Sequence, residues 1–197
     1  MCGIAGIIQF TANKDQNGLS LKRIHQNLNL MSEKIEHRGP DDKGIWISSD
    51  LRIGFAHRRL SIVDLSYSAH QPMKSNDSRY IVTFNGEIYN YMELRKNLQK
   101  KGVVFHSISD TEVLIECYRE YGYNCLQYFD GMYAFVIYDK LKDEIFAARD
   151  PFGEKPFYYS WINESFIFAS ELSAITAVPG FEKTSDLETV SQFLCLQ

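Results

Sequence analysis

Residues 132–150, MYAFVIYDKLKDEIFAARD, decide the fold class of this chain. Two runs rich in β-branched and aromatic residues, 132–139 and 144–150, flank the short polar turn KLKD, which is the pattern of a β-hairpin. A second hairpin follows, because PFYYSW (156–161) and SFIFAS (165–170) are joined by the turn INE. Strands connected this tightly run antiparallel.

Towards the N-terminus the pattern alternates between strands and helices. The expected strands are 2–10, 44–48, 51–57 and 80–84, the last of which is interrupted by NGE at 85–87. The expected helices begin near Ser20, near Asn90 and at Ser109 or Asp110, and the last two end at Gly102 and Gly122. Helices inserted between groups of antiparallel strands predict a layered α+β fold rather than a doubly wound parallel sheet.

The C-terminal part of the sequence predicts a change of organisation. A linker-like stretch, VPGFEKTSD, is followed by LETVSQFLCLQ, whose apolar residues fall at helical spacing and then end with the sequence. We therefore expect one domain over residues 1–185, with 186–197 as the start of a linker or helix that leads towards a further domain.

Composition excludes several classes of function. The chain has 197 residues and a formal net charge of −4, and no basic stripe indicates a nucleic-acid partner. It has no run of about 18 apolar residues that would span a membrane, and its first residues lack the basic flank of a signal peptide. Four cysteines without paired spacing are typical of a reducing compartment, so we expect a cytoplasmic protein.

One of these cysteines, Cys2, stands directly behind the initiator methionine. If Met1 is removed, Cys2 carries a free α-amine whose pKa, at about 7.7–8.0, suits a general base. The thiol, with a pKa of about 8.5, is readily ionised by such a neighbour. One residue then supplies both the nucleophile and its base.

Other residues offer what an acyl-transfer site needs. Asn85 supplies an amide donor for an oxyanion, and Gly86 lets backbone N–H groups approach closely; the alternative reading of Asn-Gly is a hairpin turn. HRRLSIVD (57–64) supplies arginines, and SDTE (109–112) supplies a carboxylate at the start of a helix. A surface arginine and a helix-capping aspartate remain the alternatives for these two.

Seven motifs in this order resemble one family. They are MCGI, HRGPDDKG, RLSIVD, FNGEIYN, SDTEVL, FDGMYAFVIYD and RDPFGEKPFYY. Together they resemble the glutamine-hydrolysing domain of asparagine synthetases, a class II glutamine amidotransferase with an N-terminal nucleophile, from Met1 to about Ala177. The resemblance implies a four-layer αββα sandwich of two antiparallel sheets between helices. It also implies hydrolysis of glutamine to glutamate and ammonia through a thioester on Cys2.

The resemblance further implies a role for individual residues. Arg59 would hold the α-carboxylate of glutamine, and Asp110 together with Glu87 would hold its α-ammonium group. Asn85 and Gly86 would form the oxyanion hole. The backbone of four consecutive residues would line the pocket: Leu60, Ser61, Ile62 and Val63.

The sequence departs from the family beyond this domain. It has no Ser-Gly-Gly-x-Asp-Ser loop and no Walker-type phosphate loop. We therefore expect no cofactor and no metal in this chain, with ATP and Mg²⁺ confined to an absent C-terminal synthetase domain. Glutamine and that domain are the expected partners, and a homodimer is compatible with the sequence. Two alternatives stay open: an amidotransferase domain that serves another acceptor, as in surface-sugar synthesis, and a catalytically silent glutamine-binding module.

Overall fold

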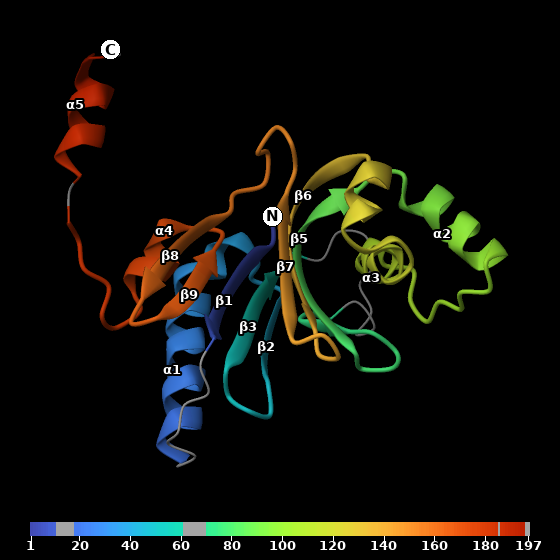
Figure 1. Cartoon of the computed structure of the whole chain (residues 1–197), viewed down its shortest axis with the longest axis horizontal. Coiled ribbons are helices and arrows are strands. Elements are labelled where there is room, and N and C mark those ends of the chain that lie inside the picture. Colours follow the sequence, from blue (N-terminus) through green and yellow to red (C-terminus); the bar gives the residue numbers. More distant parts are fainter. Residues whose placement is uncertain (11–17, 61–69, 185, 196–197) are drawn as a thin grey trace.

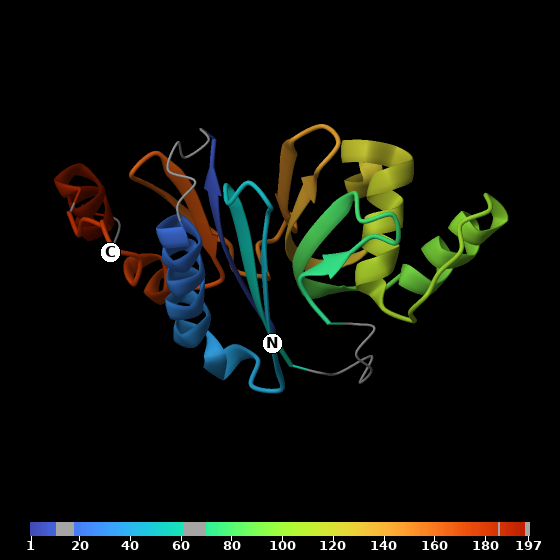
Figure 2. The same ribbon diagram turned by 90° about the horizontal axis from the view of Figure 1, so that it is seen from below.

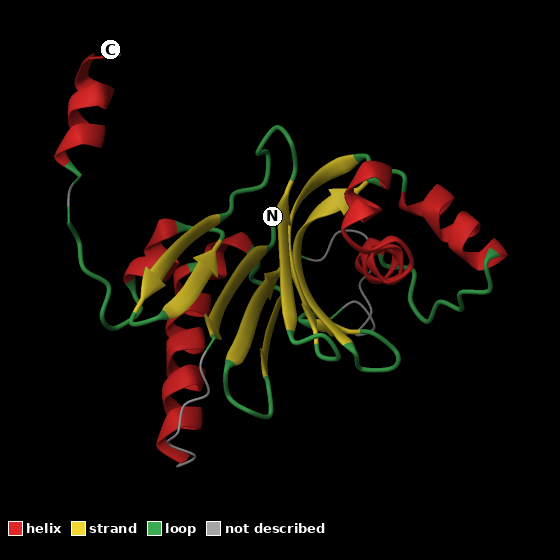
Figure 3. Cartoon of the chain, in the orientation of Figure 1, coloured by secondary structure: helices red, strands yellow, loops and turns green. Residues whose placement is uncertain are grey.

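The computed structural model describes residues 1–10, 18–60, 70–184 and 186–195, and its strands form two antiparallel sheets (Figure 3). Sheet A has the order β2-β3-β1-β9-β8, and sheet B has the order β4-β5-β6-β7. The strands of sheet A are β1 (Gly3–Gln9), β2 (Asp42–Ile47), β3 (Ile53–Arg59), β8 (Tyr158–Ile162) and β9 (Ser165–Ala169). Those of sheet B are β4 (Met73–Lys74), β5 (Tyr80–Ile88), β6 (Gly131–Asp139) and β7 (Glu144–Arg149).

Helices cover the outer face of each sheet, which confirms the predicted αββα sandwich (Figure 2). Helices α1 (Gly18–Lys34) and α4 (Leu172–Thr176) pack on sheet A. Helix α3 (Asp110–Tyr121) packs on sheet B with α2 (Tyr91–Lys100) beside it. Two 3₁₀ helices, η1 (Glu36–Arg38) and η3 (Gly122–Tyr128), follow α1 and α3. The last helix, α5 (Leu187–Cys195), extends away from the body with its apolar residues exposed (Figure 1).

Three clusters of buried apolar side chains hold the sandwich together: one between sheet A and α1, one between the two sheets, and one between sheet B and α3. Strand β1 explains why one run of sequence is apolar throughout: Ile4 and Ile8 lie between the sheets, while Ala5 and Ile7 face α1. Between the sheets the rings of Phe55 and Phe168 meet edge to face, with their centroids 5.8 Å apart. A strand buried on both faces carries no polar alternation.

Two predictions about element bounds are wrong. Strand β5 does not end at Phe84 but continues without a break to Ile88, because β6 pairs with every residue of the supposed interruption, from Asn85 opposite Ala134 to Glu87 opposite Met132. Pairing with a distant strand thus overrides the local turn tendency of Asn-Gly. Helix α1 begins at Gly18, so Ser20 is not its cap.

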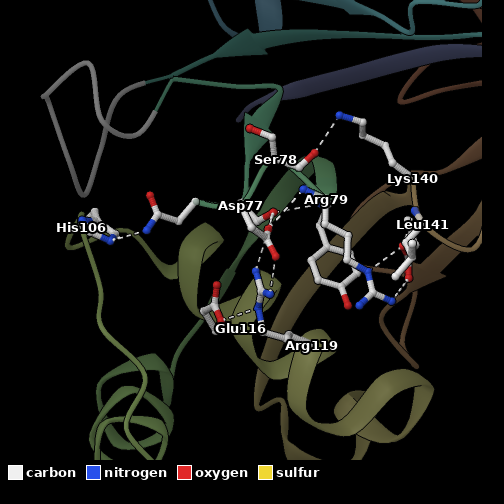
Figure 4. Close-up of polar contacts among 12 residues, drawn as sticks. Asp77, Ser78, Arg79, His106, Glu116, Arg119, Lys140 and Leu141 are labelled. Carbon is white, nitrogen blue, oxygen red and sulfur yellow. Dashed lines mark hydrogen bonds and ion pairs between the residues drawn. The ribbon is translucent and has the colours of Figure 1, made fainter.

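A polar network ties α3 to the edge of sheet B (Figure 4). Arg119 of α3 pairs with Asp77 at 2.7 Å, and Arg79 pairs with the buried Asp139 at 2.7 Å. Both guanidinium groups also lie over the ring of Tyr80, at 4.7 and 5.1 Å from its centroid. Two arginines from different parts of the chain therefore pack on one aromatic ring.

The four cysteines are all free, as the sequence predicts. Cys117 and Cys125 lie buried in the core beneath α3, and burial raises the pKa of each thiol to about 12. Cys195 is exposed on α5. No helix within the described residues is both long and apolar enough to span a membrane.

Candidate active site

The thiol of Cys2 lies beside the backbone at the end of β3. It donates to the carbonyl oxygen of Leu60 at 3.7 Å, and the Leu60 N–H donates back to the sulfur at 3.5 Å. Burial raises the pKa of the thiol, although the bond from Leu60 and the positive charges of the N-terminus and Arg59 act against that rise. The backbone of Leu60 therefore holds the sulfur in place, and burial favours its thiol form.

Cys2 borders a cavity of about 90 Å³. Six parts of the chain meet there: the N-terminus, the end of β3, the segment before β4, the second half of β5, the first turn of α3 and the loop after β7. The cavity is lined by Met1, Cys2, Arg59, Leu60, Gln71, Phe84, Asn85, Gly86, Glu87, Ser109, Asp110, Thr111 and Lys155.

The structure thus brings together seven of the residues predicted from the sequence. They are Cys2, Arg59, Leu60, Asn85, Gly86, Glu87 and Asp110. The remaining three predicted residues, Ser61, Ile62 and Val63, lie outside the described residues. These seven residues supply a nucleophile, an amide donor, one cation and two carboxylates from segments far apart in the sequence, and Lys155 adds a second cation.

Asn85 presents an unused donor in this cavity. Its side chain is 1% exposed, and its amide nitrogen has no hydrogen-bond partner among the described residues. A buried amide without a partner costs about 1–3 kcal/mol, so a ligand oxygen that accepts from it would relieve that cost. Gly86 is required beside it, because a Cβ there would lie 2.3 Å from the carbonyl oxygen of Met132.

Asp110 lies at the N-terminus of α3, between the cap of that helix and strand β5. Ser109 caps the helix by accepting from the Thr111 N–H, and Asp110 Oδ2 accepts from the Ile88 N–H of β5 at 3.1 Å. Burial raises the pKa of the Asp110 carboxyl to about 6 despite these bonds. An ammonium group bound against Asp110 and Glu87 would restore the charged form.

Two residues that the sequence reasoning missed hold the site together. Arg38 of η1 donates from Nε to the carbonyl oxygen of Cys2 at 3.1 Å and from Nη1 to Glu171 at 3.1 Å. Gln71 accepts from the Phe84 N–H at 2.7 Å and so fixes the start of the cavity wall in β5. The motif HRGPDDKG contains Arg38, but its pattern of Gly, Pro and Asp indicates only a loop.

A larger cavity of about 160 Å³ lies between α1 and the end of sheet A. Its described lining holds no cysteine, histidine or carboxylate, so it offers no thiol and no general base that could activate the hydroxyl of Ser165. Among the described residues, no three His, Cys, Asp or Glu side chains converge as metal ligands. Nucleophilic chemistry therefore points to the smaller cavity at Cys2.

The chain matches a known protein family. The family model described as a glutamine amidotransferase domain matches residues 1–197. A putative glutamine-hydrolysing asparagine synthetase 2 of Methanocaldococcus jannaschii is 41% identical over 203 aligned residues, which cover 95% of this chain and 37% of that protein. Glutamine-hydrolysing asparagine synthetase 1 of Bacillus subtilis is 39% identical over 200 residues, which cover 100% of this chain and 30% of that protein.

Solved structures share the fold at lower identity. A purine-biosynthesis regulatory enzyme superimposes with a TM-score of 0.75 at 22% identity, over 90% of this chain and 43% of the other. A glutamine phosphoribosylpyrophosphate amidotransferase of B. subtilis gives 0.71, also at 22% identity and with the same coverage. The chain spans about a third of the length of the curated relatives just described.

Proposed function

Because the chain belongs to the glutamine amidotransferase domain family, we propose that it hydrolyses glutamine to glutamate and ammonia at the cavity beside Cys2. The observation that supports this most is the convergence of Cys2, the unpartnered Asn85 amide and the charged residues Arg59 and Asp110 on one small cavity. A zwitterionic amino acid with a side-chain amide offers a matching group to each: a carboxylate to Arg59, an ammonium to Asp110, and an amide to Cys2 and Asn85.

The proposed reaction starts at the N-terminal residue after Met1 has been removed. The α-amine of Cys2 takes the thiol proton, and the sulfur bonds to the amide carbon of glutamine. The C–N bond then breaks, and the proton leaves with ammonia. Water attacks the resulting thioester, with the same amine as base, which releases glutamate and the free thiol.

Other residues bind and orient the substrate in this proposal. A guanidinium at Arg59 holds the α-carboxylate in a two-bond fork, while Asp110 and Glu87 hold the α-ammonium. Asn85 and the backbone at Gly86 donate to the oxygen as it becomes negative. Arg38 acts through the carbonyl of Cys2 and positions the nucleophile.

The ammonia is proposed to serve asparagine synthesis, because the relatives described above are named glutamine-hydrolysing asparagine synthetases. A synthetase domain, with ATP and Mg²⁺, would belong to the part of those longer proteins that this chain does not cover. A cytoplasmic setting suits a free thiol nucleophile. Transfer to another acceptor remains the second candidate, because the roles proposed for the cavity residues concern glutamine and not the acceptor of the ammonia.

Ammonia release from glutamine, measured together with the intact mass of the mature chain, tests the proposal. We expect the mass to lack one methionine residue and Cys2→Ala to abolish ammonia release. Cys195→Ala, which removes the exposed thiol on α5, is the matched control and should leave the rate unchanged. Parental ammonia release by Cys2→Ala would refute the proposal. Glutamine binding without hydrolysis by the mature parent would instead identify a silent binding module.

A further inference from the structure

The loop after β7 is built around one buried carboxylate. Asp150 accepts from the backbone N–H groups of Tyr133 at 3.3 Å, Glu154 at 2.9 Å and Lys155 at 3.0 Å. Asp150 is 4% exposed, and these three bonds hold the pKa of its carboxyl below the ordinary range despite the opposing effect of burial. The carboxylate therefore fixes the backbone of Lys155 from one side.

Arg149 fixes the same loop from the other side. Its Nε donates to the carbonyl oxygen of Lys155 at 2.7 Å, and its Nη2 donates to that of Gly153 at 2.6 Å. Gly153 has a φ of +65°, in the left-handed region that glycine adopts most readily. Both backbone groups of Lys155 are thus held by charged side chains, so its position is defined by the fold.

The Lys155 side chain borders the cavity at Cys2 although it is 6% exposed. Within the part of the chain that the structure describes, its ammonium group has no hydrogen bond or ion pair. Lysine is rarely buried to this extent unless its ammonium group is paired. The cavity is the space in which an anion would complete its interactions.

The other charges at the cavity already have proposed partners. In the proposed function, Arg59 meets the α-carboxylate of the ligand, and Asp110 with Glu87 meets its α-ammonium. The remaining negative charge belongs to the γ end: the oxygen that becomes negative during attack by Cys2, and the γ-carboxylate of the product glutamate. Glutamine itself carries no charge there.

We propose that Lys155 contacts the γ end of the bound ligand and stabilises the negative charge that forms there. This inference rests on the proposed function and adds a catalytic residue to it. No proton is transferred to or from Lys155, because the contact is electrostatic. Lys155 therefore strengthens binding of the transition state and of glutamate while leaving binding of glutamine nearly unchanged.

Calorimetric binding of glutamate and of glutamine to the Cys2→Ala protein tests this without turnover. In that background, Lys155→Met should weaken glutamate binding by about 30-fold, the equivalent of about 2 kcal/mol. Glutamine binding should change by less than about twofold, because the two ligands differ only at the γ end. Lys142→Met removes an exposed lysine from the β6–β7 turn and should change neither affinity.

Kinetics in the active protein give a second measurement. Lys155→Met should lower kcat while KM for glutamine stays nearly constant, and Lys155→Arg should keep most of the activity. If Lys155→Met unfolds at a lower temperature than the parent, Lys155→Gln replaces it in both measurements.

Three outcomes would overturn the inference. Equal weakening of glutamate and glutamine binding would place Lys155 at the α end, and unchanged affinities for both would mean that it contacts no ligand. If the Cys2→Ala protein with Lys155 intact binds neither amino acid, the proposed function itself fails. The experiment therefore separates failure of the inference from failure of the function on which it rests.

Discussion

Asp110 should make the stability of the protein depend on pH in a direction opposite to that of the surface carboxylates. Burial raises the pKa of its carboxyl from 3.8 to about 6, so the folded protein binds this proton more tightly than the unfolded chain does. The stabilisation from the neutral form is complete below about pH 4 and is lost as the pH rises through 6. Asp110→Asn cannot ionise and should not lose it.

The size of the effect follows from the two pKa values. At about 1.4 kcal/mol for each pH unit, the difference between 3.8 and about 6 amounts to about 3 kcal/mol above pH 7. Between pH 5 and pH 8 the stability of the Asn variant relative to the parent should grow by about 1.4 kcal/mol. Solvent in the cavity would reduce this value, which makes it an upper estimate.

Urea denaturation of both proteins at several pH values between 5 and 8 provides the assay. Carboxylates whose pKa is lowered, such as Asp139, titrate identically in both proteins and cancel in the difference. A difference in unfolding free energy that is flat over this range would refute the reasoning. Equal m-values for the two proteins are the control for an unchanged unfolded state.

Four further outcomes are expected. Asn85→Ala should lower kcat by about 10²–10³-fold with little loss of stability, because its amide nitrogen has no hydrogen-bond partner among the described residues; a raised KM with normal kcat would contradict the oxyanion role. Thr83→Val removes a hydroxyl bonded to the Ala56 carbonyl and should lower stability while leaving kcat unchanged. Arg38→Met should slow both turnover and labelling of the nucleophile by a glutamine-like electrophile, and undiminished labelling would count against positioning. Arg79→Met should destabilise the fold at pH 7, and this loss should shrink in acid as Asp139, whose pKa Arg79 lowers, becomes protonated; a pH-independent loss would show that the ion pair contributes nothing.

The fold was predictable where the signal is local. The two hairpins after Met132 and the ends of α2 and α3, shortly before Gly102 and Gly122, depend on turns and caps that neighbouring residues define. The course of β5 through Asn85 was not predictable, because its continuation depends on pairing with β6, more than 40 residues away in the sequence. Sequence patterns record local preference, and this pairing is not local.

The candidate site divides in the same way. Motifs identified Cys2 and Asn85 because their side chains carry the proposed chemistry themselves. The contact of Arg38 with the Cys2 carbonyl spans 36 residues and involves a backbone atom, so no pattern of residue types reveals it. Lys155 was also missed, because a lysine in a loop is usually solvated, and only its burial beside the cavity distinguishes it.

The cavity draws on both sheets, and this has a consequence for how the protein can be altered. Cys2 directly precedes β1 of sheet A, and Arg59 ends β3 of the same sheet, while Asn85 comes from sheet B. The packing of Phe55 and Phe168 against the strands of sheet B therefore sets the distance between the nucleophile and the amide donor. If one sheet were exchanged for that of a distant relative, the nucleophile and the amide donor would no longer lie at the distance that the native packing sets. Recombination within this fold should therefore succeed only when the crossover carries the facing layers of both sheets together.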